Sequence, residues 1–563
     1  MASTSKENIM DSQSTIQDLE NNGHTIEISV PSRNSLILSV SIKIFVLGLL
    51  SSYFIWASVY FFDDEDKDYN WRDELGPTTC SGYGFLLILY ILIMSGVVFN
   101  YIISPFLVPP FNKFIYRPIM DTILKFKYAD LTFSAIFFAA ILAYLIYDAS
   151  GNSERLIPIG GLLVFILMGF LMSNKKRKVH WHTVLWGLKL QFIFGLLTIR
   201  WEVGRNVFQC VGDKITVFLD YSKEGAAFVY GNDLVIPNGG IFAFSAITTI
   251  YFLAFFINIL YYYGVMQKVV GVIGEVLQFF MGTTICESVN CAANIFLGQS
   301  EAPLLLKPYL KDLTDSELNS IMTSGFATVS GSVLAAYISF GADPSALVTA
   351  SVMSAPAALC YSKMVLPETE EVKVTKDTVE IVENEYESVL DAASQGITQA
   401  FQLVSGIVSS LIAFIAFVAF INGVLGWMGN LTGYFDEDTW SLELILGKIF
   451  IPISYIMGVP WDHCEQVGQL IGIKTMVNEF VAYQKMQAMQ LTGRTKLIAT
   501  YALCGFSNPG SIGIMISTMS GLIPNKKQSV LNLVFRAFVS GALVCFMTAC
   551  IASMLYPEDT LLS

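Results

Sequence analysis

The stretch Gly298-Gln299-Ser300-Glu301-Ala302-Pro303 interrupts a long apolar segment, and Asn478-Glu479-Phe480-Val481-Ala482-Tyr483 interrupts a second one. Each is followed at the same distance by a break rich in Gly, Ser and Asn. The separation is 29 residues from Glu301 to Ser330 and 29 residues from Glu479 to Asn508. A repeated carboxylate followed by a repeated break predicts two copies of one structural unit around one site. The pattern is typical of a transporter built from discontinuous helices.

The composition places most of the chain in a membrane. Of its 563 residues, 54% are hydrophobic and 14% are charged, against about 25% charged residues in soluble domains. Several continuous apolar runs approach the ~20 residues that cross a bilayer as a helix. We therefore expect an all-α polytopic membrane protein. The acidic excess, a net charge of -13, lies in the tail and loops, and nothing resembles a basic surface that binds nucleic acid.

The order of apolar and charged segments predicts a topology. Basic loops such as Lys175-Lys176-Arg177-Lys178 stay cytoplasmic, and the sequon at Asn430 then falls outside. We expect a plasma-membrane protein with a cytoplasmic amino terminus and an extracellular carboxy terminus. Its parts are a disordered cytoplasmic tail at 1–37, amino-terminal transmembrane helices within 38–173 (near 38–62, 84–108, 131–148 and 156–173) and a transporter core at 174–563.

Within the core, straight spans alternate with broken ones. Residues 183–200 and 240–263 read as crossings joined by an interfacial segment at 201–239. The broken units are a first hairpin at about 283–310, a broken helix at about 319–339, a second hairpin at about 441–491 and a broken helix at about 496–522, before a last helix at about 530–555. The order of spans makes the two hairpins enter from opposite faces. We therefore expect an inverted repeat with two re-entrant hairpins.

Three glutamates, Glu287, Glu301 and Glu479, lie in apolar surroundings. A carboxylate inside a bilayer costs several kcal/mol or more unless it is paired or hydrated, so it marks a functional site by default. A buried capping or structural acid is the alternative for each, but the matched positions of Glu301 and Glu479 favour function. Carbonyl, Ser, Thr and Asn oxygens at the breaks suit a hard cation such as sodium. Phe506 offers a stacking face for the planar ring of a neutral ligand.

These segments resemble the concentrative nucleoside transporter family, and the spans before the core resemble the extra helices of its eukaryotic members. The resemblance implies sodium-coupled nucleoside import by an elevator-type movement in a homotrimer, with no catalytic residues. The matching stretches are Met281-Gly-Thr-Thr-Ile-Cys-Glu-Ser-Val-Asn, Asn294-Ile-Phe-Leu-Gly-Gln-Ser-Glu-Ala-Pro-Leu-Leu, Gly325-Phe-Ala-Thr-Val-Ser-Gly-Ser-Val, Asn478-Glu-Phe-Val-Ala-Tyr and Tyr501-Ala-Leu-Cys-Gly-Phe-Ser-Asn.

The resemblance also implies the site residue by residue. Ser300 stands where the family usually has Thr, and Pro509-Gly510 departs from the usual pattern. The pair Gly298-Gln299 is similar to that of broadly selective members, so we expect both purine and pyrimidine nucleosides as substrates. The implied nucleoside contacts are Gly298, Gln299, Ser300, Glu301, Val333, Glu479, Phe506, Asn508 and Ser511. The implied sodium ligands are the side chains of Asn294 and Thr328 and the carbonyls of Leu297 and Val329.

Three other functions stay open at this point. The nearest is a proton-coupled transporter of the same architecture, in which a carboxylate titrates. A second is an intramembrane hydrolase using Ser330 or Ser511, which would need a base within hydrogen-bond reach; His463 is the only histidine in the second half. A receptor or scaffold is the third, although it would not require two matched intramembrane glutamates.

Overall fold

The computed structural model describes residues 33–62, 80, 82–98, 129–149, 153–235, 241, 243–245, 247–374, 386–434, 440–489 and 491–556, and every regular element among them is helical. The chain divides into two compact units, Met1–Lys125 and Phe126–Ser563. Within the described residues, seven helices are long and apolar enough to cross a membrane, or eight if one bent pair counts as a span. The expected all-α, multi-span membrane protein is confirmed.

The first unit contains two apolar helices, α2 (Arg33–Phe62) and α4 (Gly82–Val98). They pack through aromatic rings: Phe54 stacks on Tyr90 with centroids 4.0 Å apart, and Tyr90 also donates a hydrogen bond to Ser51 Oγ at 3.2 Å. Helix α2 begins before the expected boundary at residue 38. The remainder of the expected tail, residues 1–32, and residues 99–108 of the second expected span lie outside the described residues.

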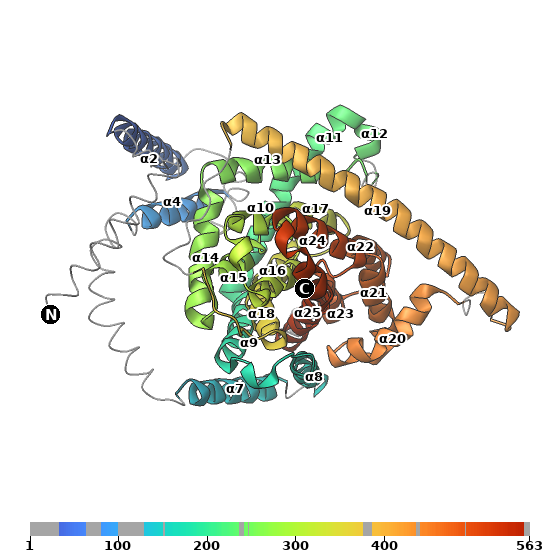
Figure 1. Cartoon of the computed structure of the whole chain (residues 1–563). Helices are drawn as coiled ribbons and strands as arrows, with labels where there is room; N and C mark the ends of the chain where they lie inside the picture. The colour runs from blue at the N-terminus through green and yellow to red at the C-terminus, as the bar shows by residue number, and fades with distance from the viewer. Residues whose placement is uncertain are drawn as a thin grey trace, which may run out of the picture. The chain divides into compact units, whose positions relative to one another are not determined.

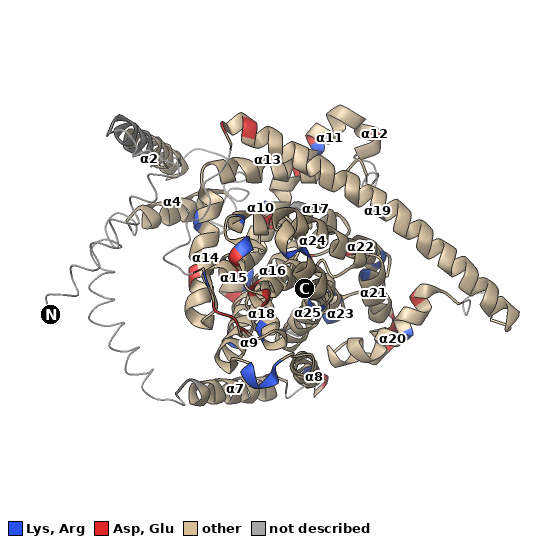
Figure 2. Cartoon of the chain, in the orientation of Figure 1, with Lys and Arg blue, Asp and Glu red and all other residues tan. Residues whose placement is uncertain are grey.

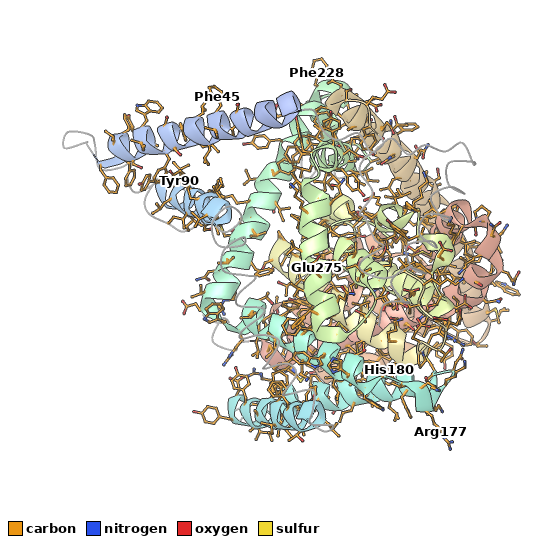
Figure 3. The ribbon with its side chains drawn as sticks, turned by 60° about the vertical axis from the view of Figure 1, so that its left-hand side comes forward. Phe45, Tyr90, Arg177, His180, Phe228 and Glu275 are labelled. Atoms are coloured by element: carbon orange, nitrogen blue, oxygen red, sulfur yellow. The ribbon has the colours of Figure 1, made fainter. Side chains whose placement is uncertain are left out.

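The second unit begins with helices that lead into the core (Figure 1). Helix α9 ends in a π-helical turn, and α10 to α12 form the segment expected at the interface. In Figure 3, Arg177 and His180 lie at the opposite end of this unit from Phe228, which is exposed. The elements are α7 (Ala129–Asp148), η3 (Ser153–Leu156), α8 (Ile157–Leu171), η4 (Lys176–Lys178), α9 (Trp181–Gly195), η5 (Leu196–Arg200), α10 (Glu202–Asp220), α11 (Ser222–Tyr230) and α12 (Asn232–Val235).

One expected crossing, residues 240–263, differs in the structure. It contains α13 (Thr249–Tyr262), which is followed by α14 (Val265–Met281) at an angle of 79°. The turn falls at Gly264, whose φ of 70° lies in the left-handed region that glycine adopts without strain. Helix α14 was not anticipated. Its apolar residues recur at helical spacing, as at Val265, Val269 and Val272, and this pattern was the available signal.

Two pairs of short helices flank breaks in the chain, and two long helices form the centre of the unit. The elements are α15 (Ile285–Ala293), η7 (Ala302–Leu306), η8 (Leu310–Asp312), α16 (Asp315–Ala327), α17 (Gly331–Ser339), α18 (Pro344–Val365), α19 (Val389–Leu431), α20 (Leu442–Ile456), η10 (Trp461–His463), α21 (Cys464–Met476), α22 (Glu479–Ala488), α23 (Gly493–Leu503), α24 (Pro509–Leu522), η11 (Pro524–Lys526) and α25 (Lys527–Leu555). The segment expected as the second hairpin thus holds three α-helices and the short 3-10 helix η10, with α20 packed against α21.

Helices α18 and α25 lie at the centre, and α19 lies along the edge of the unit (Figure 1). In the apolar windows of α18 and α25, 83% and 89% of residues are buried, against 6% in α19. The 43 residues of α19 span about 65 Å. Its only charged residue is Asp391 near its start, and in Figure 2 the rest of the helix is tan. An exposed helix with a single charge near its start suits contact with lipid or another apolar surface.

Candidate functional site

The two chain breaks lie against each other in the centre of the second unit. We call residues 328–330 break 1 and residues 504–508 break 2. The backbone N–H of Phe506 donates to the carbonyl of Thr328 at 3.3 Å, and Ser507 Oγ donates to the carbonyl of Phe326 at 3.0 Å. A helix that stops inside a membrane frees carbonyl groups that have no water to accept from. Here break 2 supplies donors for break 1.

The segment between α15 and η7 contacts break 1. We call residues 294–301 tip 1. The backbone N–H of Gly331 donates to the carbonyl of Phe296 at 3.0 Å. At Gly298 an added Cβ would lie 3.2 Å from Ser330 Cβ, so tip 1 packs closely on the break at this position. The short polar stretch from Gly298 to Pro303 is therefore packed on break 1, the break that follows it in the sequence.

The carboxylate of Glu479 is buried and held by two donors. Glu479 is 2% exposed; its Oε2 accepts from Asn508 Nδ2 at 2.6 Å, and its Oε1 accepts from Tyr337 Oη at 3.0 Å. Asn508 is also the N-cap of α24, because its Oδ1 accepts from the backbone N–H of Ser511 at 2.8 Å. Three predicted site residues are thus joined by direct hydrogen bonds.

Tyr337 is a member of this group that the sequence analysis missed. It lies on α17, is fully buried, and stacks on Tyr483 with ring centroids 4.7 Å apart. A buried tyrosine hydroxyl needs a partner, but nothing in the sequence indicates that the partner is a glutamate more than one hundred residues away. The contact depends on the packing of α17 against α22.

Tip 1 presents the other predicted polar groups. Glu301 Oε2 accepts from the backbone N–H of Gly298 at 3.1 Å. The side chain of Gln299 is 5% exposed, and its Oε1 has no hydrogen-bond donor among the described residues. An added Cβ at Gly325 would lie 2.9 Å from Gln299 Cβ, so α16 closely confines this side chain. An unpartnered buried amide oxygen is available to a ligand donor.

The remaining predicted nucleoside contacts lie on break 2, at the start of α17 and on tip 1. Phe506 and Val333 are buried, and the backbone N–H of Val333 donates to the carbonyl of Ser330 at 3.1 Å. Ser300 lies on tip 1 between Gln299 and Glu301. The predicted nucleoside contacts therefore lie in two groups, one on tip 1 and the start of α17, and one on break 2, α22 and the start of α24.

The four residues predicted to bind sodium are all buried. Asn294 Nδ2 donates to Ser324 Oγ at 2.8 Å, and Thr328 Oγ1 donates to the carbonyl of Ser324 at 2.9 Å. Asn294 Oδ1 is buried without a hydrogen-bond donor among the described residues. The carbonyl-bearing residues Leu297 and Val329 are buried as well. Neutral oxygen ligands suit sodium, and no group of three or more His, Cys, Asp or Glu side chains among the described residues could hold a metal ion.

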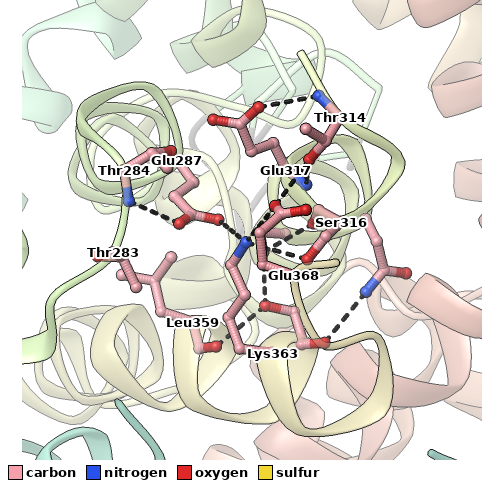
Figure 4. A network of polar contacts seen from close by, with 12 residues as sticks. Thr283, Thr284, Glu287, Thr314, Ser316, Glu317, Leu359, Lys363 and Glu368 are labelled. Atoms are coloured by element: carbon pink, nitrogen blue, oxygen red, sulfur yellow. Dashed lines mark hydrogen bonds and ion pairs between the residues drawn. The ribbon is translucent and has the colours of Figure 1, made fainter. Parts of the chain in front are cut away.

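The third intramembrane glutamate, Glu287, belongs to a separate ionic network (Figure 4). Its Oε2 lies 2.8 Å from Lys363 Nζ, and its Oε1 accepts from the backbone N–H of Thr284 in a capping box. Lys363 also pairs with Glu368 at 3.4 Å and donates to Ser316 Oγ at 3.0 Å. The network joins the start of α15, the start of α16 and the end of α18. Glu287 is therefore a buried acid that caps a helix and pairs with a lysine, which is the structural alternative to a functional role.

Glu368 follows α18 and lies outside the spanning helix. Burial alone would raise the pKa of its carboxyl group, but the Lys363 charge and hydrogen bonds from Thr314, Thr369 and Glu370 outweigh burial and lower that pKa. The carboxylate is therefore stabilised in its ionised form next to Lys363.

A buried polar site formed where two discontinuous helices cross defines the class of secondary transporters with broken spans. Family comparisons agree. Residues 346–553 match the family "Na+ dependent nucleoside transporter C-terminus", residues 160–233 match "Na+ dependent nucleoside transporter N-terminus", and residues 243–344 match "Nucleoside recognition".

Individual proteins give the same result. The chain is 40% identical over 458 residues to Sodium/nucleoside cotransporter 2 of Mus musculus, covering 78% of this chain and 68% of that protein. It is 40% identical over 469 residues to Sodium/nucleoside cotransporter 1 of Oryctolagus cuniculus, covering 79% and 70%. The chain belongs to the sodium-dependent nucleoside transporter family, as the resemblance predicted. Because this is a family of transporters, the expectation of a non-enzymatic protein is also confirmed.

Solved structures share the fold. CNTnw in an inward-facing substrate-bound state matches with a TM-score of 0.67 and 35% identity, covering 71% of this chain and 98% of that one. A variant of CNTnw in an outward-facing state matches with a TM-score of 0.69 and 34% identity, covering 72% and 99%. The two scores are nearly equal, so the comparison identifies the fold and not a transport state.

Proposed function

We propose that this protein is a sodium–nucleoside symporter that binds its nucleoside between tip 1 and break 2. Sodium-dependent nucleoside cotransport is the activity of the family to which the chain belongs. The observation that carries the proposal is the Glu479 carboxylate, held between Asn508 and Tyr337 where the chain is broken. A carboxylate fixed by donors on two other helices is positioned to accept hydrogen bonds from ribose hydroxyl groups.

The other residues take roles that follow from their chemistry. Gln299 and Glu301 on tip 1 offer an amide and a carboxylate to the hydroxyl and N–H donors of a nucleoside. Phe506 offers a ring face to the base, and Val333 an apolar contact. Gly298, Ser300 and Ser511 complete the proposed nucleoside site. None of these side chains rejects a purine or a pyrimidine by charge, which supports a broad substrate range.

Sodium binds, in this proposal, to the oxygens of Asn294, Leu297, Thr328 and Val329. The buried and unpartnered Asn294 Oδ1 supports this assignment. These groups connect tip 1 to α16, so the ion would fix tip 1 before the nucleoside completes the site. One inward sodium contributes about 2.3 kcal/mol per 100 mV, which corresponds to roughly fiftyfold accumulation of nucleoside.

The larger arrangement is part of the same proposal. Two re-entrant hairpins enter from opposite faces, and the unit that they form moves in an elevator-type step within a homotrimer in the plasma membrane. The amino terminus is cytoplasmic and the carboxy terminus extracellular. The matched 29-residue spacings support the repeat, and the exposed sequon residue Asn430 in the last turn of α19 supports the orientation.

Uptake of radiolabelled uridine, guanosine and cytidine into cells without endogenous nucleoside transport tests the function. We expect uptake in sodium medium and its loss in choline medium. Equal uptake in choline with stimulation at acidic pH would select the proton-coupled alternative, and uptake insensitive to both ions would reject symport. The hydrolase alternative is not retained, since the family consists of transporters; His463 is exposed and hydrogen-bonded to Gln466.

The site itself is tested by Glu301→Gln, which should abolish or sharply weaken uptake at unchanged surface expression. Glu465→Gln is the control, because Glu465 is a partly exposed acid that pairs with Lys448 on the neighbouring helices α20 and α21. Wild-type uptake by Glu301→Gln, or equal loss in both variants, would contradict the assignment of Glu301.

A further inference from the structure

Lys474 is a buried cation that the proposed site does not use. It lies near the end of α21, just before the turn into α22, and is 1% exposed. Its Nζ donates to the carbonyl of Ala502 at 2.8 Å. An ammonium group inside a membrane protein is costly unless other groups compensate its charge. The surroundings of Lys474 must therefore supply that compensation.

Two features of the second half compensate the charge. Ala502 lies in the last turn of α23, where carbonyl groups lack intrahelical donors and the helix dipole is negative. The N–H of Phe506, which would bond Ala502 in a continuous helix, instead bonds Thr328. The carboxylate of Glu479 also interacts electrostatically with Lys474. The ammonium thus lies at a helix carboxyl end, five residues before the carboxylate proposed to bind ribose.

The first half has an uncharged side chain, Asn294, near the position that corresponds to Lys474. An offset of 178 residues relates Glu301 to Glu479 and Ser330 to Asn508, and the same offset relates Ser324 to Ala502. In the first half, two side chains of the proposed sodium site bond Ser324: Asn294 donates to its Oγ, and Thr328 donates to its carbonyl. In the second half, Ala502 accepts from Lys474, two residues beyond the position that the offset assigns to Asn294.

We infer that Lys474 supplies a permanent positive charge in the second half, at a place that corresponds to the proposed sodium ion in the first half. Its ammonium joins the α21–α22 turn to the end of α23 and offsets the charge of Glu479. The nucleoside-binding carboxylate of the second half is therefore held in place without an ion from solution, whereas tip 1 requires bound sodium. This inference rests on the proposed function and deepens it. Lys474 acts through Glu479 as a positioning residue.

Ligand-induced thermal stabilisation of the purified full-length protein in detergent tests the inference. The probes are sodium chloride against choline chloride without nucleoside, and then uridine or guanosine at saturating sodium. Lys474→Met should keep the sodium-induced shift in melting temperature and weaken apparent nucleoside affinity at least roughly tenfold. Lys474→Arg retains the charge and should restore most of that affinity. Lys448→Met, at an exposed lysine on α20, is the control and should match the wild type.

Each outcome decides one question. Wild-type nucleoside affinity in Lys474→Met would overturn the inference, and so would loss of the sodium shift together with the nucleoside shift. Absence of a nucleoside shift in the wild type would instead reject the proposed function. If Lys474→Met does not fold, Lys474→Met with Glu479→Gln provides the second test. Recovery of a folded protein would support the charge pairing, and failure of both variants would overturn it.

Discussion

The hydrogen bond from Tyr337 to Glu479 allows the proposed ribose site to be tested without changing either charge or shape. Tyr337→Phe removes one hydroxyl group and leaves the ring stacked on Tyr483 and packed beside Phe480. The carboxylate Oε1 then loses a donor 3.0 Å away. Because Glu479 is almost completely buried, no water replaces that donor at low cost.

The expected magnitude follows from the charge of the acceptor. A hydrogen bond to a charged group contributes about 1.5–3 kcal/mol, against about 0.5–1.5 kcal/mol for a neutral pair. If Tyr337 fixes the carboxylate for the nucleoside, most of that loss falls on substrate binding. The KM for nucleoside should then rise roughly 10- to 150-fold, at about tenfold per 1.4 kcal/mol.

The matched control lies next to Tyr337. Tyr483→Phe removes the same group from an equally buried ring, but Tyr483 donates to the backbone carbonyl of Thr500 at 2.9 Å and not to the carboxylate. It should cost about 1 kcal/mol of stability and change the KM by less than roughly threefold. The assay is initial-rate uptake at saturating sodium, normalised to surface protein measured by biotinylation. Equal effects of the two substitutions on the KM, or no effect of Tyr337→Phe, would refute the reasoning.

Three further predictions concern the network around Lys363 and the packing of tip 1. Lys363→Met should lower the free energy of unfolding by about 3–5 kcal/mol, because it leaves Glu287 buried and unpaired. Adding Glu287→Met should recover most of the loss, and thermal melting in detergent measures both variants. If the effects of the two substitutions on stability simply add in the double variant, the pairing is contradicted. The pKa of Glu368 is lowered in the folded protein, so its stabilising effect is full above the unfolded pKa of about 4.3 and is lost as the pH falls through the folded value. Between pH 5.5 and 3.5, the melting temperature of Glu368→Gln should therefore fall less than that of the wild type. Melting temperatures that fall equally in both proteins would argue against the lowered pKa of Glu368. Gly325→Ala should reduce nucleoside uptake more than surface expression, because the new Cβ would displace Gln299. Unchanged uptake would show that tip 1 can move away from α16 without loss of transport.

The sequence predicted the helical class and the pairing of polar stretches with chain breaks, because both leave local signals. Intramembrane glutamates are rare and conspicuous in apolar segments, and Gly, Ser and Asn mark where helices stop. The capping role of Asn508 follows the same local logic, since Asn is a favoured N-cap residue.

Contacts that depend on tertiary packing could not be predicted. Tyr337 and Lys474 lie in helices whose sequences show no partner. Tyr337 finds its partner only when α17 packs against α22, and Lys474 only when α21 packs against α23. The bend at Gly264 was missed for a different reason. Because the expected crossing ends at residue 263 and no helix is expected from 265 to 281, there is no second helix for a bend at Gly264 to join.

The crossing of the two breaks has a consequence for biosynthesis. The carbonyl of Phe326 receives its hydrogen bond from Ser507, which is 181 residues further along the chain. At about 5–20 residues per second, a ribosome makes that intervening chain in roughly 10–40 s. For that time, the first half is in the membrane with acceptors whose donors have not been made. Water or the insertion machinery must solvate these carbonyl groups, and the first half reaches its final structure only when the second arrives.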